Sequence, residues 1–229
     1  MAILMFSMDP SMYSNSYLMS ASFYAVLNDE LRRLQWLESQ EYNPERYAEK
    51  QAIILCWQGF MWWFLWGLRD CPKFAGVVYR AVMVPDAKEL TSSYAAGRKV
   101  VWSSFSSTSK SLRQAWLVAA RAALQAGVSM DRVNERVVTF KIQVFCGRNI
   151  QKYSYFEEEE EVLMTPQSEY IVAFPSVEKQ RISTVKDEFM HKDIAMMDIN
   201  FVPITKRCLR DVDCICLTEV DLAQGTYTF

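Results

Sequence analysis

Apolar residues recur at helical spacing through the first part of the chain. Between Phe23 and Glu38, valine and leucine return every three to four positions with charged residues between them, which predicts an amphipathic helix. The Asn43-Pro44 pair then suits the start of a second helix, because asparagine caps helices well and proline fits their first turn. Residues 52–68 form an apolar run of 17 positions in which Gln58 is the strongly polar interruption.

That apolar run suits either a helix that spans a membrane or a helix that is buried in the protein. Its length lies at the lower limit for crossing a bilayer, and a predicted strand follows it closely. We therefore expect a core helix, with no stable membrane insertion. Its tryptophans are expected to lie mostly in the core, with a partner surface as the alternative: Trp57, Trp62, Trp63 and Trp66.

From residue 73 onward the pattern changes to short apolar runs bounded by turn residues, which predicts strands. We expect them at 76–84, 97–105, 137–145, 162–164 and 170–174, with further candidates at 202–204 and 213–218. A helix is expected over 111–125 and ends at Gly127, while Gly147 is expected to turn the chain.

Helices followed by a mostly β part predict an α+β fold. A chain of 229 residues suits one domain. We expect it to comprise a helical lobe over residues 1–72 and a β-rich core over residues 73–229.

Charge and composition remove several classes of function. The net charge is −2, and lysine and arginine are scattered without a basic stripe, so nucleic acid is not an expected partner. The chain has six cysteines without a known disulfide or zinc spacing, and one histidine, His191. We therefore expect no metal site, reduced thiols and no histidine-based hydrolase.

No basic segment precedes the short apolar start, and so no signal peptide is seen. The expected location is the cytoplasm, or a host cytosol if the protein is a secreted bacterial effector.

Candidate chemistry lies in three short segments. Arg80 sits inside an apolar run, where a guanidinium needs a partner such as a phosphate or a carboxylate. Residues 105–109 read Phe-Ser-Ser-Thr-Ser, and five consecutive glutamates at 157–161 lead directly into an apolar strand. Each segment has an ordinary alternative: a strand arginine paired with glutamate, a helix cap and a solvated acidic loop.

Two carboxylates at the start of a strand suit cleavage of a glycosidic bond. The transition state of that reaction resembles an oxocarbenium ion, which a fixed negative charge stabilises. A second carboxylate two residues away can accept a proton from the incoming nucleophile.

Taken in order, Arg80, residues 105–109 and residues 159–163 resemble the R-S-E triad of arginine-specific mono-ADP-ribosyltransferases, a family of vertebrate ecto-enzymes and bacterial toxins. The resemblance covers about residues 74–175. Supporting it are a Gly-Arg-Asn-Ile segment at 147–150, an aromatic residue ahead of the glutamates, and Tyr94 with Gly97 before the serines. It implies a helical N-terminal lobe followed by a β-sandwich-like NAD-binding core.

The resemblance also implies roles for individual residues. Arg80 would hold the phosphates of NAD, and the backbone of Ala81 would meet the nicotinamide amide, where the family often has glycine. Ser107 would position the catalytic glutamate, with Thr108 and Ser109 beside it in the NAD site.

On the acidic side, Glu161 would be the catalytic glutamate and Glu159 would accept the proton of the target guanidinium. Phe156 would lie on the loop that meets the substrate protein. Trp116 is a weak candidate for stacking on nicotinamide, and a core role in its helix is the stronger expectation.

The expected function is therefore transfer of ADP-ribose from NAD to an accessible arginine of a target protein, without a metal. Two alternatives stay open. The same site with water as acceptor would make an NAD glycohydrolase. A catalytically silent module of this fold would instead bind a partner through its aromatic helix or acidic loop.

Overall fold

The computed structural model describes residues 23–41, 43–129, 132–154, 156–184 and 208–220. Its helices are α2 (Phe23–Glu38), α3 (Pro44–Asp70), α4 (Ala87–Ser92), α5 (Leu112–Gln125) and α6 (Val133–Arg136). Its strands are β1 (Lys73–Met83), β2 (Lys99–Trp102), β3 (Ser106–Ser109), β4 (Val137–Asn149), β5 (Glu161–Met164), β6 (Ser168–Thr184) and β7 (Cys208–Glu219). Two short 3₁₀ turns, η3 (Gln151–Tyr153) and η4 (Glu157–Glu159), precede β5.

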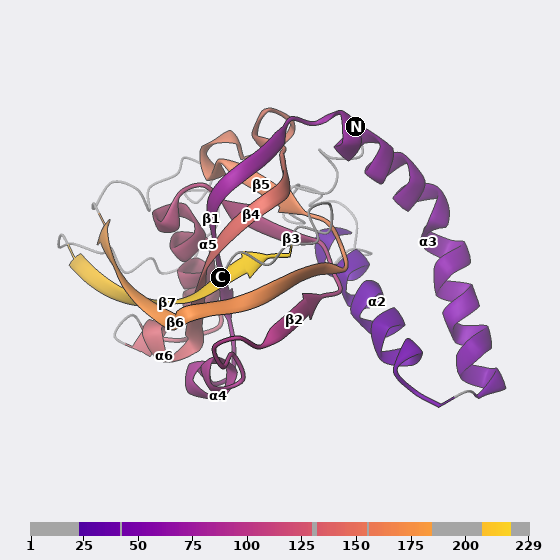
Figure 1. The fold of residues 1–229 in the computed structure, drawn as a ribbon, viewed down its shortest axis with the longest axis horizontal. Helices are drawn as coiled ribbons and strands as arrows, with labels where there is room; N and C mark the ends of the chain where they lie inside the picture. The colour runs from indigo at the N-terminus through magenta and orange to yellow at the C-terminus, as the bar shows by residue number, and fades with distance from the viewer. Residues whose placement is uncertain (1–22, 42, 130–131, 155, 185–207, 221–229) are drawn as a thin grey trace.

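The α+β prediction is confirmed, because N-terminal helices precede a mixed sheet (Figure 1). Helix α2 has the predicted bounds, and α3 begins where the sequence indicates. The Asn43 side chain caps α3 by accepting hydrogen bonds from the backbone N–H groups of Glu45 and Arg46. The division into a lobe over residues 1–72 and a core over 73–229 stays a prediction, although the change from helix to strand lies beside that boundary.

The expectation of a mostly buried tryptophan cluster on α3 is wrong. Trp62 and Trp63 are 63% and 68% exposed, and Trp66 is 45% exposed. The buried side of α3 instead consists of Ile53, Phe64 and Leu68. No described helix is both long enough and apolar enough to cross a membrane.

The seven strands that the structure describes form one sheet in the order β1-β3-β5-β4-β7-β6-β2, with β1 also paired to β4. The strands β1, β3, β5 and β4 therefore form a closed circuit of antiparallel pairings. β7 joins β4 in parallel, and β6 and β2 extend the sheet beyond it.

Three groups of buried residues hold these layers together. The main group lies on one face of the sheet and includes Val78, Phe140 and Ile142. A second group packs α5 on the sheet through Trp116 and neighbouring alanines. A third joins the N-terminal helices to the sheet and contains Leu27, Phe64, Leu68, Cys71, Phe105, Ile150 and Leu163. These contacts fix the helical pair beside the segment that carries the serines.

Several predicted strand limits are corrected. The serines at 106–109 do not end the strand that was expected over 97–105; they form a strand of their own, β3. Gly147 does not turn the chain but lies within β4 opposite Phe74. A Cβ at this glycine would lie 2.7 Å from Val162 Cγ1, so the close approach of β4 to β5 requires glycine.

Two further strands are longer than predicted. The strand expected over 170–174 is β6, which continues to Thr184, and the candidate at 213–218 lies within the longer β7. The candidate strand at 202–204 and His191 lie outside the described residues.

Candidate active site

Arg80 projects from β1 among polar and aromatic partners. Its Nη1 donates to the carbonyl oxygen of Ser107 at 2.9 Å and to the hydroxyl of Tyr24 at 3.4 Å. Its Nη2 donates to the same hydroxyl at 3.5 Å, and its Cζ lies 5.7 Å from the ring centroid of Trp102. Arginine has five N–H donors. Its planar guanidinium fork also suits an anionic group such as a phosphate.

Glu161 is the first residue of β5 and is only 5% exposed. Its Oε2 accepts a hydrogen bond from Ser154 Oγ at 3.0 Å. Burial raises the pKa of its carboxyl, while hydrogen bonds from Ser107 and Ser154 and the charge of Arg80 lower this pKa in part. A buried carboxylate with these three partners forms the centre of the candidate site.

Glu159 lies half-buried at the end of η4. Burial is the main cause that raises its pKa to about 7, and the negative charge of Glu161 adds to the rise. Arg121 acts in the opposite direction and Glu158 in the same direction. The two carboxyl groups are therefore close enough to influence each other, and one of them titrates near neutral pH.

The acidic run thus divides into residues of different character. Glu157 and Glu158 are exposed, as a solvated loop requires. Glu160 adopts the left-handed conformation with φ 48° and ψ 46°, which reverses the chain between the turn and β5. This residue lets Glu159 and Glu161 have different surroundings although they are two positions apart.

The serine segment lies directly against the buried glutamate. β3 pairs with β5 so that Ser109 is opposite Glu161, Thr108 opposite Val162 and Ser107 opposite Leu163. The Ser107 hydroxyl hydrogen-bonds the Glu161 carboxyl. The hydroxyls of its neighbours are used elsewhere: Thr108 Oγ1 donates to the carbonyl of Val162, and Ser109 Oγ accepts from the backbone N–H of Ser111.

The remaining predicted residues lie in different surroundings. Ala81 is half-buried and packs against the cluster under α5. Phe156 is half-buried and immediately precedes η4, where its N–H donates to Ser154 Oγ at 3.3 Å. Trp116 is 1% exposed within the cluster under α5, which confirms the core role.

Sequence reasoning missed two contributors to the site. Tyr24 belongs to α2, yet its hydroxyl contacts Arg80 and donates to the carbonyl oxygen of Phe105 at 3.3 Å. Nothing in the local pattern of a helix indicates such a distant contact. Ser154 was also not predicted as a site residue, because its separation of seven residues from Glu161 carries no periodic signal.

Comparisons with known proteins identify the family of the chain. The family model described as NAD:arginine ADP-ribosyltransferase matches residues 12–188. The chain belongs to this family. All the predicted site residues fall within the matched range. No curated protein sequence matches the chain.

Solved structures of bacterial proteins are similar to the chain at low identity, and HopU1 and the Vis toxin among them are named as ADP-ribosyltransferases. HopU1 of Pseudomonas syringae pv. tomato DC3000 is 17% identical with a TM-score of 0.48, covering 96% of this chain and 75% of that one. The Vis toxin from Vibrio splendidus is 17% identical with a TM-score of 0.45, covering 95% and 83%. The catalytic domain of VsdC from Aeromonas hydrophila is 17% identical with a TM-score of 0.39, covering 96% and 97%. Because these scores are below 0.5, family membership rests on the family model.

Proposed function

We propose that this protein transfers ADP-ribose from NAD to an arginine side chain of a target protein and releases nicotinamide. The observation that carries the proposal is the pair of glutamates at the start of β5. Glu161 is buried among hydroxyls and a guanidinium, and Glu159 beside it has a pKa near the pH of cells. Family membership supplies the class of reaction.

In this proposal Arg80 binds the diphosphate of NAD. Its planar fork suits phosphate oxygens better than a single ammonium group does. The hydroxyl of Tyr24 and the carbonyl of Ser107 hold the guanidinium in place. Ala81 lies next to Arg80 in β1, so its backbone would lie close to the nicotinamide end of the same molecule.

Glu161 supports cleavage of the bond between ribose and nicotinamide. Positive charge develops on the ribose as that bond breaks, and a fixed carboxylate beside it stabilises the transition state. Ser107 and Ser154 donate to this carboxyl and so fix its orientation. The positions of Thr108 and Ser109 support a bracing role around Ser107, because their hydroxyls are used by Val162 and Ser111.

Glu159 makes the acceptor arginine reactive. A guanidinium is protonated at neutral pH and must lose a proton as its nitrogen attacks the ribose carbon. A carboxylate that titrates near neutral pH can take that proton and can also attract the cationic side chain. Phe156, at the start of the same turn, is placed to contact the target protein.

The proposal is tested with NAD labelled in its adenosine half. The wild type is mixed with agmatine, a free guanidine, and the labelled product and free nicotinamide are both followed. We expect labelled agmatine in amounts that match the nicotinamide released. Nicotinamide without labelled agmatine or labelled protein would indicate an NAD glycohydrolase, and no NAD consumption would indicate a binding module; either result would overturn the proposal.

A further inference from the structure

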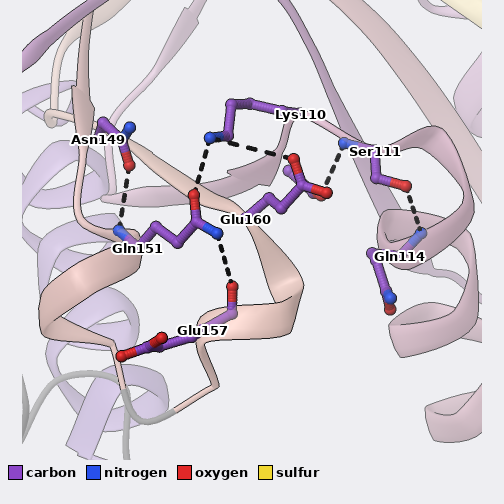
Figure 2. A network of polar contacts seen from close by, with 8 residues as sticks. Lys110, Ser111, Gln114, Asn149, Gln151, Glu157 and Glu160 are labelled. Carbon is purple, nitrogen blue, oxygen red and sulfur yellow. Dashed lines mark hydrogen bonds and ion pairs between the residues drawn. The ribbon is translucent and has the colours of Figure 1, made fainter.

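Lys110 lies between β3 and α5. It contacts the turn formed by residues 157–160 through both its backbone and its side chain. Its N–H donates to the carbonyl oxygen of Glu160 at 3.3 Å. Its Nζ donates to Gln151 Oε1 at 2.8 Å and lies 4.0 Å from Glu160 Oε2 (Figure 2). The half-buried Lys110 therefore contacts both Glu160, at the end of the turn, and Gln151.

Gln151 extends these contacts to the other end of the turn. Its Nε2 donates to the carbonyl oxygen of Glu157 at 3.0 Å, and its N–H donates to Asn149 Oδ1 at 3.2 Å (Figure 2). Asn149 is the last residue of β4. We call Lys110 and Gln151 together the clasp, because they connect both ends of residues 157–160 to the ends of two strands.

The clasp adds to the few hydrogen bonds that the turn makes through its own backbone. None of the residues of η4 is buried. The backbone bonds within it are Glu159 N–H to the carbonyl of Phe156 and Glu160 N–H to the carbonyl of Glu157. Glu160 also holds a left-handed conformation, which costs a residue other than glycine on the order of 1 kcal/mol. The clasp thus holds the backbone on both sides of Glu159, at Glu157 and at Glu160, and so acts on the direction of the side chain between them.

We propose that Lys110 and Gln151 are positioning residues that orient Glu159 toward the acceptor and so determine how much ADP-ribose goes to arginine and how much to water. This inference rests on the proposed function. Neither residue needs to touch NAD or the acceptor. Because Glu161 is anchored separately by β3 and Ser154, loosening the turn affects the transfer step and spares NAD cleavage.

The test uses the full chain with four substitutions and a matched control. Lys110→Met and Gln151→Leu remove the clasp at similar side-chain volume, and Lys110→Arg keeps a donor for Gln151. Glu160→Asn removes only the 4.0 Å ion pair, since asparagine tolerates the left-handed conformation. The control is Lys152→Met, an exposed lysine one residue beyond Gln151. For each variant, kcat/KM for agmatine and the rate of NAD hydrolysis without acceptor are measured.

We expect Lys110→Met and Gln151→Leu to lower transfer to agmatine by about 5–30-fold, while NAD hydrolysis stays within about 2-fold of the wild type. Lys110→Arg, Glu160→Asn and Lys152→Met should stay within about 3-fold in both assays. Normal transfer in Lys110→Met would overturn the positioning role of the clasp but not the proposed function. Equal losses of transfer and hydrolysis would also overturn the positioning role, because they indicate a purely structural role. A wild type that labels neither agmatine nor protein would overturn the proposed function, and the proposal for the clasp with it.

A second measurement reports on the turn without any turnover. A protease that cuts after glutamate can reach the exposed Glu157 and Glu158, and mass spectrometry identifies the bond that is cut. We expect cleavage in this turn to be at least about 5-fold faster in Lys110→Met and Gln151→Leu than in the wild type and in Lys152→Met. Equal cleavage rates would contradict the claim that the clasp holds the turn.

Discussion

At the scale of single residues, environment gives one residue type several different properties. Five glutamates follow one another in the sequence, yet two are exposed, one has a pKa of about 7 and one is almost completely buried. Two carboxyl groups whose surroundings differ in this way can serve one reaction as charge stabiliser and as base. Five identical residues in a row do not indicate these differences in the sequence, because the differences arise from the fold around each glutamate.

The pKa of Glu159 predicts the pH dependence of transfer. Since this carboxyl must be ionised to accept a proton, kcat/KM for agmatine should rise as pH increases through about 7. The apparent value belongs to the pair of glutamates because they interact. Measurement of transfer from pH 5 to pH 9 checks this, and Glu159→Gln should lack the rise. A flat profile in the wild type, or an unchanged rise in the variant, would speak against Glu159 as the base.

Replacement of Arg80 tests the proposed phosphate contact. Lysine keeps the charge but loses the planar fork and the geometry that Tyr24 and Ser107 support. Arg80→Lys should therefore raise the KM for NAD on the order of 10-fold. The exposed Arg98, changed to lysine, provides the control and should have no effect. An unchanged KM in Arg80→Lys, measured by nicotinamide release, would exclude the phosphate role.

At the scale of elements, β5 is held between β3, which the sequence pattern does not indicate, and β4, whose end the sequence pattern places too early. β3 consists of serine and threonine, so no hydrophobic pattern marks it; its pairing with β1 and β5 makes it a strand. β4 runs past Gly147, where a turn seemed natural, because the missing side chain lets β5 approach. The amphipathic helices and most of β4 were predictable from their own residues, whereas β3 and the end of β4 depend on their neighbours.

Gly147→Ala should disturb β5 through the contact of the new methyl group with Val162 Cγ1. We expect a loss of about 1–3 kcal/mol in the free energy of unfolding, together with reduced NAD cleavage, since Val162 follows Glu161. The additional change Val162→Ala makes room and should recover part of both losses, which denaturation and nicotinamide release would measure. If the double variant showed simple addition of the two single effects, this contact would not be the cause.

At the scale of the whole molecule, the site combines parts that are far apart in the sequence. Tyr24 comes from α2, Arg80 from β1, the serines from β3, and the glutamates from η4 and the start of β5. The residues that the strands contribute were predicted from the order of the three motifs, because that order resembles the pattern of one family. The contact from α2 could not be predicted, because helix periodicity reports which face is buried and not what that face meets.

Burial of the Glu161 carboxyl in the site should lower the stability of the folded protein. The folded-state pKa of Glu161 lies above its ordinary value of 4.5, so the folded state loses stability as pH rises through that raised pKa. Glu161→Gln removes the charge at similar volume and should stabilise the protein by about 0.5–2 kcal/mol at pH 8. The gain should vanish below pH 4.5, where both states hold the proton. Denaturant unfolding at several pH values measures this, and a Gln variant that is less stable at pH 8 would contradict the electrostatic account.

The most direct test of the central claim compares Glu159→Gln with Glu161→Gln in both reactions. The account predicts that Glu159→Gln lowers transfer to agmatine by about 10²-fold or more, while NAD hydrolysis without acceptor stays within a few-fold of the wild type. Glu161→Gln should lower both reactions by about 10²–10³-fold. Equal losses of transfer and NAD hydrolysis in Glu159→Gln would contradict the separate roles of the two glutamates. Near-normal NAD cleavage in Glu161→Gln would contradict them as well.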